Sequence, residues 1–214
     1  MSTKAVVFDL GGVLIDWDPR YLYRKLLADE AAVEEFLATV CTPEWNAELD
    51  RGRPFAEGVA ELVERHPEHA AAIAAYHERW PEMLAGDLPG TVEVLAELRA
   101  AGVPLYALTN WSAETFVLAR ERFAFLDWFD GLLVSGEERM IKPDPALYYR
   151  ALDRFGLNDV KVEVTPDGDH YDGLARAGRG VDHADRRRLL LADDQPAVEA
   201  ERHPVRGRRV GEHG

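Results

Sequence analysis

The sequence predicts an α/β protein with a doubly wound, Rossmann-like parallel sheet as its core and a small helical cap inserted after the first strand. Residues 5–8 form an apolar run that ends at a carboxylate and two glycines, which is typical of a buried strand. Residues 20–85 carry apolar residues at helical spacings only. From residue 89, helical and strand patterns alternate, which favours a parallel sheet covered by helices on both faces.

The first half of the alternating region has clear boundary signals. "TVEVLAELRAAGV" is an amphipathic helix that Gly102 should end, and "PLYALTN" at 104–110 is a buried strand. Ser112 is expected to cap the helix "AETFVLARERF", because a serine side chain can accept a hydrogen bond from a first-turn amide.

The second half continues the same alternation. "GLLV" at 131–134 is the next strand, and Asp144 with Pro145 is a favourable start for the helix "ALYYRALDRF", which Gly156 should end. "LLLADD" at 189–194 again has the pattern of a buried strand that runs into carboxylates.

These patterns divide the chain into two parts. Residues 1–16 and 88–214 are assigned to the core, and residues 17–87 to the cap. Residues 158–188 and 203–214 show weak periodicity and no core pattern, so we expect them to be divergent or disordered.

Composition excludes several classes of protein. The chain has 214 residues, 47% of them apolar, which suits one α/β domain with a small insertion. Its net charge of −14 argues against nucleic acid as a partner. The single cysteine, Cys41, excludes an internal disulfide. No apolar run approaches the ~20 residues that span a membrane, and the N-terminus lacks a secretory pattern. We expect a cytoplasmic protein with no membrane partner, and leave its oligomeric state open.

Polar residues gather at the predicted strand ends. Asp9, Thr109 and the loop after Val134 each follow a buried strand. Ligands of open parallel sheets bind at the carboxyl ends of the strands, so these segments should line one crevice.

Four segments, in this order, resemble the haloacid dehalogenase-like (HAD) hydrolase superfamily. They are "FDLGGVLID" with Asp9, "LTN" with Thr109 and Asn110, "KPDP" with Lys142, and "LLLADD" with Asp193 and Asp194. The resemblance implies hydrolysis of a small phosphorylated molecule, with Asp9 as a nucleophile that forms a covalent intermediate.

The resemblance also implies roles for the neighbouring residues. Thr109 and Asn110 would bind the transferring group, and Lys142 would neutralise its charge. Substrate-binding residues are expected at Gly12, Trp17 and Trp111. Trp45 and Arg51 are further candidates for the substrate pocket, although core packing is the better interpretation for the tryptophans.

A Mg²⁺ site is expected beside the nucleophile. The resemblance assigns it to Asp9, the backbone carbonyl of Gly11, and a pair of acids later in the chain. Two pairs compete for that place: Asp167 and Asp169 in "PDGD", and Asp193 and Asp194 in "LLLADD". We favour Asp193 and Asp194, because their strand is continuously apolar whereas "VKVEV" alternates.

Gly11 departs from the phosphatase pattern. Most phosphatases of the superfamily carry at this position an aspartate that protonates the leaving oxygen, which contributes ~10²–10⁴-fold to the rate. Three hypotheses stay open: a phosphatase with a substituted acid or a good leaving group, a 2-haloacid dehalogenase, and a weakly active or inactive binding protein. Asp16 and Asp18 are candidates for a substituted acid, although turn formation is the more economical interpretation of both.

Overall fold

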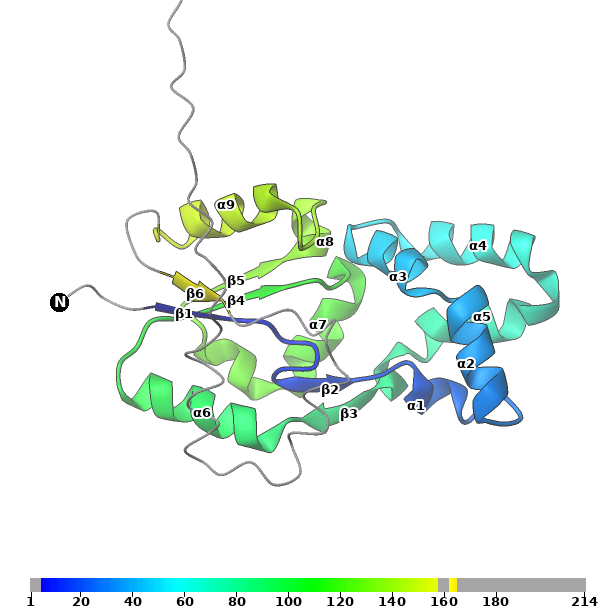
Figure 1. Cartoon of the computed structure of the whole chain (residues 1–214), viewed down its shortest axis with the longest axis horizontal. Helices are drawn as coiled ribbons and strands as arrows, with labels where there is room; N and C mark the ends of the chain where they lie inside the picture. The colour runs from blue at the N-terminus through cyan, green and yellow to red at the C-terminus, as the bar shows by residue number, and fades with distance from the viewer. Residues whose placement is uncertain (1–4, 158–161, 165–214) are drawn as a thin grey trace, which may run out of the picture. The chain divides into compact units, whose positions relative to one another are not determined.

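A four-stranded parallel sheet forms the core of the computed structural model, which describes residues 5–157 and 162–164 (Figure 1). The strand order is β5-β4-β1-β6. The strands are β1 (Ala5–Phe8), β4 (Leu105–Thr109), β5 (Gly131–Val134) and β6 (Val162–Val164). Every neighbouring pair is parallel. The chain divides into two units, Met1–Val181 and Asp182–Gly214, and all described residues belong to the first.

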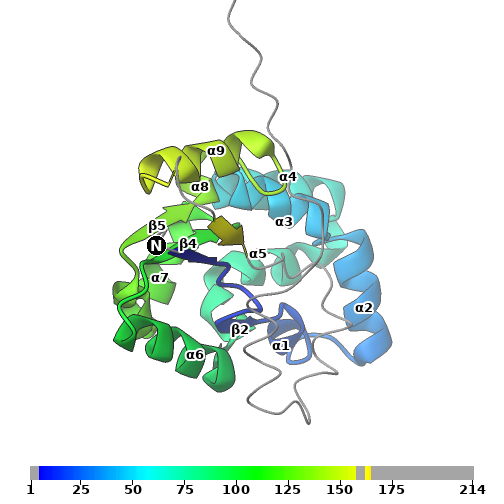
Figure 2. The ribbon, with the colours of Figure 1, turned by 60° about the vertical axis from the view of Figure 1, so that its left-hand side comes forward.

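Helices cover both faces of the sheet, as a doubly wound fold requires. The helices α6 (Pro89–Ala100) and α7 (Ala113–Arg122) lie on one side, and α9 (Pro145–Arg154) lies on the other (Figures 1 and 2). Two short elements, η3 (Ala124–Trp128) and α8 (Ser135–Glu138), connect β5 to its neighbours in the chain.

The predicted helix boundaries are confirmed where capping residues define them. The Ser112 side chain accepts a hydrogen bond from the Glu114 amide at 3.3 Å, and Asp144 accepts one from Ala146 at 2.9 Å. Gly102 and Gly156 follow the ends of α6 and α9 with positive φ angles. Local side-chain chemistry therefore sets where these helices begin and end.

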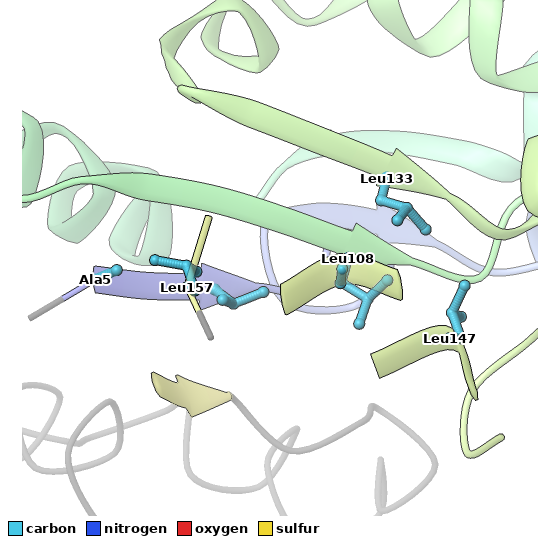
Figure 3. Packing of buried hydrophobic residues seen from close by; sticks show 7 residues of the cluster. Ala5, Leu108, Leu133, Leu147 and Leu157 are labelled. Carbon is cyan, nitrogen blue, oxygen red and sulfur yellow. The ribbon is translucent and has the colours of Figure 1, made fainter. Parts of the chain in front are cut away.

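An apolar cluster between the sheet and α9 fixes the middle of the sheet (Figure 3). It consists of Ala5, Val7, Leu108, Leu133, Leu147, Ala151 and Leu157. Full burial of one leucine side chain contributes about 1.5–3 kcal/mol, so this cluster holds β1 firmly beside β4. Residues that follow these two strands are thus placed on one rigid edge.

A helical segment joins β1 to α6. It runs through α1 (Arg20–Tyr23), α2 (Glu30–Thr39), α3 (Pro43–Asp50), α4 (Phe55–Arg65), η1 (Pro67–His69), α5 (Ala70–Glu78) and η2 (Trp80–Met83). Two strands, β2 (Ile15–Trp17) and β3 (Leu84–Asp87), pair antiparallel where the chain enters and leaves it. The expectation of helix alone through residue 85 is corrected here. The sequence "LAGD" of β3 has weak strand propensity, and backbone pairing with β2 overrides it.

The helical segment has its own aromatic core. The rings of Trp45 and Tyr76 meet edge to face at 4.9 Å, and Tyr23 packs against Phe36 at 4.6 Å. The Trp45 indole N–H donates to the Gly58 carbonyl at 3.2 Å, which confirms core packing as the role of this tryptophan. Within the described ranges, no helix is both long and apolar enough to cross a membrane.

Candidate active site

Asp9 forms a buried ion pair with Lys142 at the carboxyl end of β1. Lys142 Nζ lies 2.8 Å from Asp9 Oδ2, and the two side chains are only 3% and 11% exposed. The Leu10 backbone amide donates to Asp9 Oδ1 at 2.7 Å. Removing one partner of such a pair leaves an uncompensated buried charge, so each residue depends on the other.

The turn after Asp9 is tight. The amides of Leu14 and Ile15 both donate to the Leu10 carbonyl at 2.9 Å, and Gly12 has a φ of +73°. That backbone conformation favours glycine. Gly11 differs, because a Cβ built there would meet no atom within 4 Å. The absence of a carboxylate at position 11 is therefore not imposed by crowding among the described residues.

Asn110 holds the backbone of Lys142. Its Nδ2 donates to the Lys142 carbonyl at 3.1 Å, and its Oδ1 accepts from the Lys142 amide at 2.8 Å. These two hydrogen bonds bring the loop after β4 and the loop before α9 together, although 32 positions separate the residues. Asn110 thus acts on the site through the placement of Lys142.

Thr109 ends β4 with a buried hydroxyl. The residue is 1% exposed, and its Oγ1 has no hydrogen-bond partner among the described residues. β4 lies next to β1 in the sheet, so Thr109 and Asp9 share the same edge. Because an unsatisfied buried hydroxyl costs free energy, this group is suited to bind a ligand oxygen.

Trp111 and Trp17 differ in their burial and in the residues that surround them. Trp111 is 5% exposed, and its indole packs against Trp80 at 5.5 Å. Its Nε1 also has no partner in the described part of the chain. Trp17 is partly buried at the end of β2, opposite Leu84. Only Trp111 is continuous with the loop that carries Thr109 and Asn110.

Asp50 is a site residue that the sequence did not reveal. It ends α3, and its Oδ2 accepts a hydrogen bond from Asn46 Nδ2 at 2.9 Å. Burial raises the pKa of Asp50 to about 7, amides of Ser112 and Asn46 lower it, and the Asp9 charge raises it. Asp50 lies in the stretch "WNAELDRGR", and nothing in that stretch indicates that its charge interacts with that of Asp9.

The helical segment is fastened to the core around Asp50. Ser135 Oγ donates to the Asp50 carbonyl at 2.6 Å and accepts from the Trp111 amide at 2.8 Å. A second attachment joins the Phe55 amide to Glu114 Oε1 at 3.0 Å. A serine after β5 therefore links the end of α3 to the loop that carries Thr109.

Asp16 and Asp18 have structural partners. The Tyr21 hydroxyl lies 3.0 Å from each oxygen of Asp16. Asp18 Oδ1 accepts from the Arg20 amide at 2.8 Å, at the start of α1. This supports the structural interpretation of both acids. Arg51, offered as a substrate contact, lies 3.4 Å from Glu48 on the same helix.

The structure describes only some of the predicted metal ligands. Asp9 and Gly11 lie together, whereas Asp167, Asp169, Asp193 and Asp194 fall outside the described residues. Within 5–157 and 162–164, no group of three or more His, Cys, Asp or Glu side chains gathers to hold a metal ion. One finding bears on the competing pairs: β6, in "VKVEV", pairs with β1. The alternating pattern therefore did not keep this segment out of the sheet.

Comparison with known proteins gives a consistent picture. Residues 3–168 match the haloacid dehalogenase-like hydrolase family. The sesquiterpene phosphatase astK of Aspergillus oryzae is 31% identical over 165 residues, which cover 77% of this chain and 80% of that protein. A HAD family enzyme of Bacteroides thetaiotaomicron, in complex with magnesium and inorganic phosphate, superposes with a TM-score of 0.57 at 20% identity. The superposition covers 82% of this chain and 90% of that enzyme. An L-2-haloacid dehalogenase superposes with a TM-score of 0.58 at 22% identity, and the superposition covers 90% of this chain and 100% of the dehalogenase. The chain belongs to the haloacid dehalogenase-like hydrolases.

Proposed function

We propose that the protein is a phosphatase that hydrolyses a small phosphate ester through an aspartyl-phosphate on Asp9. The observation that carries this proposal is the buried Asp9–Lys142 pair, at the same sheet edge as the Thr109 hydroxyl that has no partner among the described residues. A carboxylate held in this way can attack phosphorus and split one difficult step into two easier ones. The phosphatase relative at 31% identity supports the choice of phosphorus as the target.

Each residue of the site has a task in this reaction. Asp9 Oδ attacks the phosphoryl group, and Lys142 stabilises the negative charge that gathers on the phosphoryl oxygens. Thr109 Oγ1 donates a hydrogen bond to one of these oxygens. Asn110 keeps Lys142 in place through its backbone, and Gly12 lets the turn approach the ligand closely.

The donors near Asp9 suit Mg²⁺. A carboxylate and the Gly11 carbonyl are hard oxygen ligands of the kind that Mg²⁺ prefers. When bound, the ion would offset the repulsion between Asp9 and an anionic phosphate. The magnesium complex of the Bacteroides thetaiotaomicron enzyme supports this assignment.

Two acid pairs compete to complete the metal site. The sequence favoured Asp193 and Asp194, but the pairing of β6 with β1 supports Asp167 and Asp169, which follow that strand closely. Replacement of the true pair by asparagine should abolish Mg²⁺ binding measured by calorimetry. The same change in the other pair serves as the matched control and should leave Mg²⁺ binding intact.

The helical segment would serve as a cap over the site. We propose that residues 17–87 exclude water from the intermediate and contribute substrate contacts, with Trp17 and Trp111 at the substrate. The attachments of α3 to the first residue of α8 and of α4 to the first turn of α7 support this placement.

A panel of substrates tests the function. Phosphate esters and 2-haloacids should be offered with added Mg²⁺ and with EDTA. We expect hydrolysis of phosphate esters only with metal, and none in Asp9→Asn, whose fold circular dichroism should show unchanged. Turnover of phosphate esters by Asp9→Asn would contradict the mechanism.

A 2-haloacid dehalogenase is the second candidate, and Gly11 favours it. A halide leaves without a proton, so this chemistry needs no acid at position 11. Halide release in the presence of EDTA would establish this alternative. A folded protein that turns over nothing in the panel would instead indicate a binding protein.

A further inference from the structure

Cleavage of an alkyl phosphate needs a proton for the leaving oxygen, and Gly11 cannot give one. This problem exists only if the proposed phosphatase function holds, and the inference below rests on it. The acid must then come from another element that reaches the same edge of the sheet.

We propose that the carboxyl group of Asp50, at the end of α3, gives this proton and later accepts one from the attacking water. In the first half-reaction, Asp9 Oδ forms a bond to phosphorus, the bond from phosphorus to the ester oxygen breaks, and the Asp50 proton passes to that oxygen. In the second half-reaction, the Asp50 carboxylate takes a proton from water as the water oxygen forms a bond to phosphorus and the bond from phosphorus to Asp9 Oδ breaks. Inorganic phosphate leaves, and both side chains return to their starting states.

The attachment of α3 places Asp50 over the strand ends. Its backbone carbonyl accepts from Ser135, directly after β5, and its carboxylate accepts from the Ser112 amide, in the loop after β4. Two glycines let these backbones approach closely. A Cβ on Gly52 would lie 2.6 Å from the Gly136 carbonyl oxygen, and one on Gly136 would lie 2.5 Å from the Ala113 nitrogen. Asp50 is therefore held firmly at the edge where Asp9 lies.

Asp50 also comes from the correct side of the site. In an in-line displacement the leaving oxygen points away from the nucleophile, towards whatever covers the strand ends. Asp50 belongs to the helical segment, whereas Asp9 belongs to the sheet. The residue as a whole is half-buried.

The pKa of Asp50 suits a group that acts first as an acid and later as a base. Its burial and the nearby Asp9 carboxylate bring its pKa to about 7, although the Ser112 and Asn46 amides oppose this. Among the described residues, the titratable groups that interact electrostatically with it are Asp9, from the end of β1, and Tyr76, from α5. Tyr76 donates to Asn46 Oδ1 at 2.7 Å and so orients the amide that holds Asp50. A carboxyl group with a pKa near the working pH can give a proton in one step and accept one in the next.

The other acidic side chains in this part of the structure have structural hydrogen-bond partners. Asp16 is bonded by Tyr21, Asp18 starts α1, and Glu114 accepts from the Phe55 amide. Of the described acids, Asp50 combines attachment at the strand ends with an electrostatic effect from Asp9.

The test compares two leaving groups in the Asp50→Asn variant, which keeps the size of the side chain. An alkyl phosphate needs the proton, whereas 2,4-dinitrophenyl phosphate leaves readily without it. We expect kcat/KM for the alkyl phosphate to fall by about 10²-fold or more. For the dinitrophenyl ester we expect kcat/KM to change by less than about threefold, because this ratio covers only the steps up to release of the leaving group and no proton is needed there. Asp16→Asn, the matched control, should change neither rate.

Equal losses of kcat/KM on both substrates would assign Asp50 a structural role and overturn the proposal, and so would unchanged values of kcat/KM on both. In the wild type, kcat/KM for the alkyl phosphate should fall as the pH rises through about 7, while kcat/KM for the dinitrophenyl ester should not. This pH comparison needs no variant, and its failure would also overturn the proposal.

A gain-of-function variant gives a further test. A side chain at position 11 has open space, so Gly11→Asp combined with Asp50→Asn should recover at least ~10-fold of the lost rate on the alkyl phosphate. No recovery would count against proton donation as the lost function. If the wild type hydrolyses neither ester, the proposed function itself fails. If it hydrolyses both and Asp50→Asn has no selective effect, only the present inference fails.

Discussion

Asp9 and Lys142 show how strongly two residues can depend on each other. Both side chains are almost fully buried, and their charged atoms lie 2.8 Å apart. The interior is a poor solvent for a lone charge, so the pair is tolerated because its members neutralise each other. The same arrangement gives the site a carboxylate with a fixed positive neighbour.

Replacement of Lys142 should therefore cost stability as well as activity. We expect Lys142→Met to lower the free energy of unfolding by about 3 kcal/mol, because the buried Asp9 carboxylate loses the positive charge beside it. In Asp9→Asn/Lys142→Met much of this loss should return, since no charge is left alone. Urea denaturation of the two single variants, the double variant and the wild type measures the coupling. If the losses of unfolding free energy in the two single variants simply added up in the double variant, the ion pair would not be the cause of the destabilisation.

At the level of elements, the contact between α3 and the core is built on one serine. Ser135 Oγ donates to the Asp50 carbonyl and accepts from the Trp111 amide, so it joins three segments that lie far apart in the sequence. Close backbone contacts at Gly52 and Gly136 leave little room for these segments to separate. The place that we propose for the helical segment, as a cap over the site, thus depends on this junction.

Ser135→Ala should loosen the junction. It leaves the buried Trp111 amide without its acceptor, which costs about 1–3 kcal/mol of unfolding free energy. We also expect a rise in KM, because the loop with Thr109 is held less firmly. Thr42→Ala, which removes only the N-cap of α3, is the control and should cost about 1 kcal/mol without a change in KM. Equal KM values in all three proteins would contradict a role for the junction in substrate binding.

Across the whole molecule, much of the core could be predicted from the sequence, because its signals are local. The strands at 5–8 and 131–134 are continuous apolar runs, and Ser112 and Asp144 cap α7 and α9. β2 and β3 were missed, since short strands with "LAGD" carry almost no pattern.

The site was only partly predictable for a different reason. Asp9, Thr109 and Lys142 stand in recognisable motifs, whereas Asp50 gains its character from Ser112, Asn46 and Asp9. Its hydrogen bond with Ser112 and its electrostatic interaction with Asp9 arise from the fold, so no local pattern indicates them. Asp193 and Asp194 lie outside the described residues, and their assignment stays a prediction.

Asp50 should also make the stability of the whole molecule depend on pH. Its pKa rises from 3.8 to about 7 on folding, so the folded state binds this proton more tightly than the unfolded state. The resulting stability is complete below about pH 4 and is lost as the pH rises to about 7. Relative to Asp50→Asn, the wild type should therefore lose about 2–4 kcal/mol of unfolding free energy between pH 4 and 8. Parallel pH profiles from urea denaturation of the two proteins would show that Asp50 does not titrate in this range.

The central claim is that Asp9 becomes phosphorylated during turnover. The most direct test is to mix the enzyme with Mg²⁺ and a phosphate ester, quench in acid within the first turnovers, and map the digested protein by mass spectrometry. We expect the peptide that contains Asp9 to gain the mass of one phosphoryl group, and the label to disappear in Asp9→Asn. Steady hydrolysis of the ester with no phosphoryl group on Asp9 at any quench time would contradict the account.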